Sequence, residues 1–147
     1  MSRQLHLLTS LLLVFSFTLL SCGEGEEQWV EEHGYGPISE PLVFNGIDDD
    51  LAVEGKQIFD SYCAACHAMN ASISGPALGR ITERRTPEFV INYTLNPREN
   101  RQQHPIGQEL ADNYPGGMAN TGIDEDQARA VLEYLRYYSE YREDPSD

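Results

Sequence analysis

The chain has 147 residues, enough for one small domain, and its 24 acidic side chains outnumber its 10 basic ones, giving a formal net charge of −14. Because nucleic-acid phosphates are neutralised by Lys and Arg, so acidic a chain argues against binding to nucleic acid and against a polybasic hold on anionic lipids. A protein that docks on this surface is expected to bring a basic or locally basic face.

The first 21 residues have the pattern of an export signal. Arg3 precedes an apolar run from Leu7 to Leu20, which is shorter than the ~20 apolar residues that span a bilayer. The following "LLSC" resembles a bacterial lipoprotein processing site, at which Cys22 is lipidated and becomes the new N-terminus. We therefore predict a signal peptide over residues 1–21 and lipid attachment at Cys22, the alternative being an uncleaved membrane anchor.

Residues 22–49 have the composition of a linker. Acidic residues, glycine and proline dominate this segment, and no apolar period persists along it. Such a composition is typical of an extended, self-repelling chain. We predict an acidic flexible tether here, followed by a folded domain over residues 50–141 and an acidic tail over residues 142–147.

The first half of the predicted domain contains two helical patterns. Apolar side chains recur on one face of the stretch 48–62, and an aspartate at its start can cap a helix. The segment "TPEFVINYTLN" at 86–96 is predicted to be a short helix, with Thr86 as its cap and a proline at the first helical position.

The second half ends in the strongest helical pattern of the chain. A short helix is expected around 107–113, followed by the loop "PGGMANTG". The stretch 123–143 has an apolar stripe, and Asp124 and Gln127 have the spacing of a capping box. Since no strand-like alternation is visible, we predict an all-α fold whose core is thin enough to need an additional apolar group.

Two of the three cysteines stand three residues apart in "SYCAACHAMN", and His67 follows the second one directly. A redox dithiol expects a preceding strand, and a structural zinc site needs four suitably placed ligands; neither setting is apparent here. A Cys63–Cys66 disulfide would close too small a loop to stabilise much. Cys-x-x-Cys-His is the attachment signature of c-type haem, because one helical turn places both thiols on one face and directs His67 towards the iron.

A haem iron bound by His67 needs a ligand on its opposite face. Met69 is too close to His67 along the chain to reach that face, and His33 lies in the predicted tether. His104 sits in a polar loop, where we expect it to be solvated. Met118 follows two glycines whose backbone freedom can bring a thioether to the iron, so we predict Met118 as the second axial ligand. The alternative is that Met118 fills the core.

Several ordered segments resemble class I c-type cytochromes of the small bacterial monohaem kind. Gly55 and Phe59 lie eight and four residues before Cys63, which is the family's spacing in its first helix. "CAACH" matches the haem motif, "GPALGR" resembles the stretch that follows it, and "RRTPEFVINYTLNPRE" resembles the central helix. "YPGGMANTGIDEDQARAVLEYLRYY" resembles the axial-methionine loop and last helix. The resemblance covers about residues 50–141.

This resemblance implies the cytochrome c fold and one covalently bound haem c. Carried over residue by residue, Cys63 and Cys66 are the thioether sites, and His67 and Met118 are the axial ligands of the iron. The backbone carbonyl of Pro76 would hold the far ring nitrogen of His67 and so fix the orientation of the imidazole.

The resemblance also suggests which charged residues meet the haem and its partners. Arg80, with Arg84 and Arg85, is a candidate to balance the haem propionates, the alternative being a solvated cationic face. Family members that dock on acidic partners often carry a ring of lysines, whereas Lys56 is the only lysine in this sequence.

With both axial positions filled, no coordination site is open to a substrate, so we expect electron transfer and not enzymatic catalysis. The predicted function is a single-electron carrier of a bacterial respiratory chain, working between a quinol-oxidising complex and a terminal oxidase or reductase. The predicted location is the periplasmic side of the membrane, with inner or outer membrane left open. The alternatives are a fixed electron-transfer subunit of one oxidoreductase, and a haem sensor or enzyme if Met118 does not bind iron.

Overall fold

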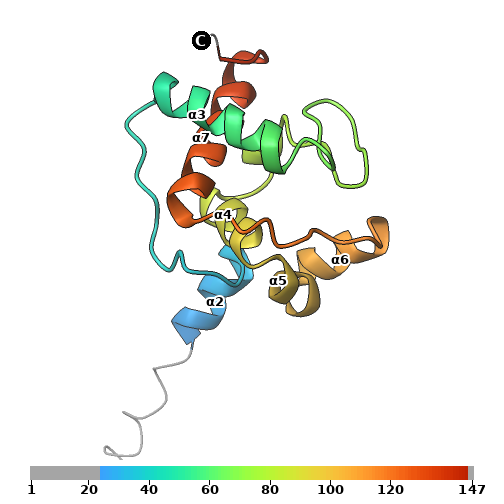
Figure 1. Cartoon of the computed structure of the whole chain (residues 1–147). Coiled ribbons are helices and arrows are strands. Elements are labelled where there is room, and N and C mark those ends of the chain that lie inside the picture. The colour runs from blue at the N-terminus through green and yellow to red at the C-terminus, as the bar shows by residue number, and fades with distance from the viewer. Residues whose placement is uncertain (1–23, 146–147) are drawn as a thin grey trace, which may run out of the picture.

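The computed structural model describes residues 24–145, which form α-helices and one short 3₁₀ helix without any β-strand (Figure 1). The helices are α2 (Glu24–His33), α3 (Asp49–Tyr62), η1 (Ile81–Glu83), α4 (Pro87–Leu95), α5 (Pro97–Gln103), α6 (Pro105–Asn113) and α7 (Glu125–Tyr141). The predicted all-α fold is confirmed. No helix within residues 24–145 combines the length and apolar character that crossing a bilayer requires. The predicted signal peptide and Cys22 lie outside the described residues.

Helices α3 and α7 begin with the caps that the sequence predicts. The Asp48 carboxylate accepts a hydrogen bond from the Leu51 amide at 3.0 Å. At α7, the Asp124 carboxylate accepts from the Gln127 amide at 2.8 Å, and the Gln127 side chain accepts from the Asp124 amide at 3.1 Å. These reciprocal bonds satisfy amides that have no partner within the helix.

The long helices α3 and α7 cross in close contact (Figure 1). Gly55 lies at the crossing, where a Cβ atom would overlap the backbone carbonyl of Ala130. One turn later, the rings of Phe59 and Tyr134 meet edge to face, with centroids 5.4 Å apart. The absence of a side chain at Gly55 therefore lets the two backbones approach, and Phe59 continues from this contact into the core.

Three short α-helices, α4, α5 and α6, lie between α3 and α7 along the chain. Each begins with a proline, namely Pro87, Pro97 and Pro105. Proline is well suited to the first helical position, because its missing amide would have no partner there. Thr86 caps α4 as predicted, accepting from the Phe89 amide at 3.2 Å. Helix α5 was not predicted, and α6 starts two residues before the expected range.

The prediction of a flexible tether over residues 22–49 is wrong for the part that the structure describes. Residues 24–47, which we call the N-terminal strap, contain α2 and pack against α4 and α5. Ile38 is only 5% exposed and belongs to the core. The buried Asn92 side chain accepts from the Ile38 amide at 2.9 Å and donates to the carbonyls of Ile38 and His33, each at 3.0 Å. The strap is therefore held chiefly through its backbone.

Two buried carboxylates also accept hydrogen bonds from backbone amides, one within the strap and one at the residue that follows it. The Glu88 carboxylate accepts from the Leu42 amide at 2.6 Å, and the Glu133 carboxylate accepts from the Asp48 amide at 2.7 Å. Both glutamates are at most 5% exposed. Charged side chains are rarely buried unless paired, and here they satisfy amides that would otherwise lack partners.

The expectation that His104 is solvated is also wrong, since its side chain is 1% exposed. Its Nδ1 accepts from the Ile106 amide at 3.2 Å and so caps α6. Its Nε2 then carries the proton and donates to the Glu31 carbonyl at 3.1 Å, at the end of α2. His104 thus fastens the N-terminal strap to the domain.

The first residues of the predicted acidic tail form hydrogen bonds with the folded domain. Helix α7 ends at Tyr141, and the capping residue Arg142 that follows has a left-handed backbone with φ of 62°. The Arg142 guanidinium donates to the Gly79 carbonyl at 2.9 Å, and the Tyr134 hydroxyl donates to the Asp144 carboxylate at 2.7 Å. The folded part of the chain therefore extends past residue 141.

Candidate functional site

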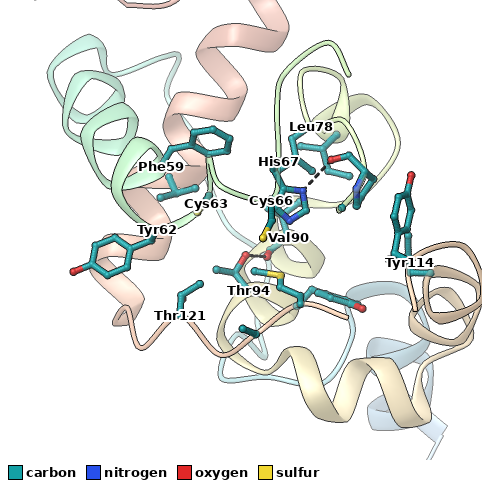
Figure 2. A pocket seen from close by; sticks show the side chains of 18 of the residues that line it. Phe59, Tyr62, Cys63, Cys66, His67, Leu78, Val90, Thr94, Tyr114 and Thr121 are labelled. Carbon is teal, nitrogen blue, oxygen red and sulfur yellow. Dashed lines mark hydrogen bonds between the residues drawn. The ribbon is translucent and has the colours of Figure 1, made fainter. Parts of the chain in front are cut away.

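The end of α3 brings both cysteines and His67 to one wall of a cavity (Figure 2). The Cys63 amide donates to the Phe59 carbonyl at 2.8 Å, and the His67 amide donates to the Cys63 carbonyl at 2.9 Å. Hydrogen-bonded turns therefore follow α3 through the motif and keep the two thiols on neighbouring positions. Cys63 is buried, whereas Cys66 is exposed at the edge of the cavity.

Two neighbours set the orientation of the His67 imidazole. Its Nδ1 lies 2.9 Å from the Pro76 carbonyl (Figure 2), and since a carbonyl can only accept, Nδ1 carries the proton. Gly75 passes so close that a Cβ atom there would overlap the imidazole ring. This arrangement leaves the Nε2 lone pair available as a metal ligand.

Met118 lines the same cavity from the loop that connects α6 to α7. Gly117 precedes it with φ of +66°, a left-handed conformation that favours glycine. The Arg101 guanidinium braces this loop by donating to the carbonyls of Tyr114 and Pro115, each at 3.1 Å. The loop that carries Met118 is thus held by hydrogen bonds from α5.

The remaining walls of the cavity are mostly apolar. They include side chains from α3, α4, α7 and the connecting segments, among them Phe59, Leu78, Phe89, Val90, Val131 and Leu135. Two thiols on neighbouring positions, an imidazole with a free Nε2 and a thioether together suit a haem that is attached through sulfur and ligated by nitrogen and sulfur. The residues present therefore fit a c-type haem.

The two competing chemistries for the cysteine pair find less support. Burial, and secondarily the neighbouring Cys66, raise the pKa of the Cys63 thiol to about 11. A reactive dithiol requires a lowered thiol pKa, so this environment opposes redox exchange. Within residues 24–145, no three His, Cys, Asp or Glu side chains are grouped to hold a metal ion, which disfavours a structural zinc site.

The other candidate axial ligands lie outside the cavity lining. Met69 is partly buried and packs against the hydrophobic core. His33 ends α2, and its Nδ1 lies 2.9 Å from the Thr86 hydroxyl. His104 is occupied by the strap, as described above. Met118 is the only one of these four residues that the structure brings to the cavity beside His67.

The arginine at the cavity is not the one that the sequence suggested. Arg80 is exposed and forms an ion pair with Glu83 at 2.7 Å, and it is absent from the cavity lining. Hydrogen bonds from Arg80 and Arg142 lower the pKa of Glu83 to about 2. Arg101 lines the cavity instead. No local motif marks Arg101, because its contacts are to a loop 13 and 14 residues further along the chain.

Comparison with known proteins agrees with this site. Residues 52–139 match the family model for cytochrome c. A cytochrome c-553-like protein from Synechocystis sp. is 31% identical over 78 residues, which cover 51% of this chain and 70% of that protein.

Solved structures give the same result for the fold. Cytochrome c from Rhodothermus marinus superimposes with a TM-score of 0.72 at 39% identity, covering 76% of this chain and 96% of that chain. An engineered form of that protein, bound to a carbene intermediate, has a TM-score of 0.69 at the same identity. The helical architecture is therefore the cytochrome c fold.

Proposed function

The chain belongs to the cytochrome c family, whose members bind c-type haem covalently, and we propose that it is a single-electron carrier. In this proposal Cys63 and Cys66 form the thioether bonds, and His67 and Met118 are the axial ligands of the iron. The observation that carries the proposal is that both cysteines, the imidazole and Met118 line one cavity. The sequence contains one Cys-x-x-Cys-His motif, which corresponds to one haem.

The haem, when bound, supplies a one-electron couple at its iron. The residues of the chain hold that couple in a defined environment. The Pro76 carbonyl keeps the imidazole of His67 in one orientation, and apolar side chains such as Phe59 and Leu135 exclude water. Ligation by His67 and Met118 would leave no position for a substrate, which supports electron transfer over catalysis.

Replacing Met118 by alanine tests the ligand assignment. We expect Met118→Ala to lose the weak far-red absorbance of a methionine–iron bond, to bind CO readily when reduced, and to lower the reduction potential by on the order of 0.1 V. Visible spectra and a potentiometric titration measure these changes. Met69→Ala is the matched control and should keep the band and the potential. An unchanged band in Met118→Ala would remove Met118 from the iron.

The wider role is part of the same proposal. We place the carrier on the periplasmic side of a bacterial membrane, where it would take electrons from a quinol-oxidising complex and pass them to a terminal oxidase or reductase. Support comes from the cytochrome c family and from the export-signal pattern of residues 1–21.

Lipid attachment at Cys22 is a further part of the proposal, based on the sequence "LLSC". Cys22→Ser should move most of the protein from the membrane fraction to the soluble fraction, because the site of acylation is lost. Fractionation followed by immunoblotting measures this change, with Ser21→Ala as the neighbouring control that should stay with the membrane. A Cys22→Ser protein that fractionates like the wild type would contradict lipid anchoring at this residue.

A further inference from the structure

Two uncharged segments form the opening of the haem cavity. Residues 61–79 and residues 113–123 contain no Asp, Glu, Lys or Arg, although such residues make up 23% of the chain. The cavity-lining residues that are exposed to solvent all come from these two segments, and they are Tyr62, Cys66, Ser74, Gly117 and Ala119. The exposed part of the cavity lining therefore carries no formal charge, and the charged lining residue, Arg101, is partly buried and donates to the Tyr114 and Pro115 carbonyls. We call the exposed residues of the two segments the rim.

The two segments contact each other, and the rim is partly apolar. The hydroxyls of Ser72 and Tyr114 lie 3.2 Å apart and connect one segment to the other. Tyr62 is 51% exposed and Ile73 is 57% exposed, so both present large apolar side chains to solvent. Figure 2 shows Tyr62 projecting from the end of α3 at the side of the cavity. Exposed apolar side chains beside a functional opening are typical of an interaction surface.

The acidic residues that give the chain its net charge lie outside the rim. Asp60 and Asp112 immediately precede the two segments along the chain, and Asp124 follows the second. Further carboxylates stand on α2 and at the start of α3. At about 0.1 M ionic strength, exposed charges more than about 10 Å apart are largely screened. A partner with a lysine ring would therefore meet carboxylates only at the edge of the rim, at Asp60, Asp112 and Asp124, and none on the rim itself.

From this charge distribution we propose that the rim is the docking surface for a redox protein whose own electron-entry site is surrounded by uncharged, apolar side chains, in place of the basic partner that the net charge alone suggests. The inference rests on the proposed electron-carrier function. Tyr62 lines the cavity and Ile73 precedes the exposed lining residue Ser74, so contact through these two side chains would place the partner beside the cavity opening. The acidic surface elsewhere would then affect only the long-range approach of the two proteins.

The test measures electron transfer from the reduced, haem-loaded protein by stopped flow. The two oxidants are a blue copper protein with an apolar patch over its copper site and a cytochrome c with a lysine ring, chosen with similar potentials. At physiological ionic strength, we expect the copper protein to react faster. Its rate should change by about twofold or less when the salt concentration is raised tenfold.

Substitutions then test the surface itself. Ile73→Glu should slow the reaction with the copper protein by about fivefold or more, since a carboxylate in an apolar contact must be desolvated. Ala71→Glu, at a second exposed rim residue, should have the same direction of effect. Val43→Glu is the matched control, because Val43 is an 85% exposed residue of the strap and does not line the cavity. It should leave the rate unchanged.

Several results would overturn this docking surface. These are a faster reaction with the lysine-ring cytochrome, an equal slowing by Val43→Glu, and wild-type rates for Ile73→Glu and Ala71→Glu. A dimer in analytical ultracentrifugation that Ile73→Glu dissociates would assign the rim to a second copy of the chain instead. The spectrum and the potential of each variant separate these results from a failure of the proposed function, because docking changes neither of them.

Discussion

Replacing both Cys63 and Cys66 by serine should yield a chain that carries no covalent haem and does not fold cooperatively. The haem cavity lies between α3, α4 and α7, and its walls include core side chains such as Phe59 and Leu135. Without the haem, these apolar surfaces would be left facing water in a small domain whose core they help to form. Haem staining on denaturing gels measures attachment, and near-UV circular dichroism with thermal melting measures folding.

The two single substitutions, and a substitution at the third cysteine, serve as controls for the double variant. Cys63→Ser and Cys66→Ser should each keep some staining, because one thioether bond can remain. Cys22→Ser removes a cysteine that is remote in sequence from the motif, and should retain full staining. If the double variant stained as strongly as the wild type, the haem would have to be attached elsewhere.

The sequence was most informative where the interacting residues are close together in the chain. The caps at Asp48, Thr86 and Asp124 depend on groups three residues away, so short sequence patterns predict them. The cysteines and His67 form one contiguous motif, and this made the cofactor predictable. Predicting Met118 as a ligand required more than a local motif, since its place in the cavity depends on a loop far along the chain.

The N-terminal strap was missed because its partners are distant in sequence and polar. Composition describes the strap's own residues, which are rich in glutamate, glycine and proline, and these favour a linker. What fixes the strap is its backbone, bonded to the buried side chains of Asn92, Asn100 and His104. The Asn100 side chain, for example, accepts from the Tyr35 amide at 2.8 Å and donates to its carbonyl at 2.6 Å. A buried polar side chain that binds a distant backbone leaves no periodic signal in the sequence.

Replacing Asn92 by alanine should therefore destabilise the protein and free the strap. The Asn92 side chain is fully buried and serves four backbone groups, the Ile38 amide and the carbonyls of Ile38, His33 and, at 3.5 Å, Gly34. Because unsatisfied buried polar groups cost ~1–3 kcal/mol each and partial relaxation will recover some of this, we expect the free energy of unfolding to fall by about 3–4 kcal/mol. Denaturant titration measures the loss, and limited proteolysis should show new cleavage within the strap.

Asn113→Ala is the matched control, since Asn113 is exposed and donates only to the Glu109 carbonyl at 3.0 Å. It should change the free energy of unfolding by less than about 0.5 kcal/mol. A loss below about 1 kcal/mol in Asn92→Ala, with an unchanged proteolysis pattern, would contradict the role given to the strap.

The strap also determines how far the haem domain can move from the proposed lipid at Cys22. Helix α2 begins at Glu24, two residues beyond Cys22, so a packed strap keeps the domain close to its anchor. Freeing the strap would insert roughly 25 extended residues, or about 80 Å of reach, between lipid and domain. Asn92→Ala should then alter electron transfer to a membrane-bound partner more than electron transfer to a soluble oxidant. Equal effects on the two reactions would mean that the strap stabilises the fold without positioning the carrier.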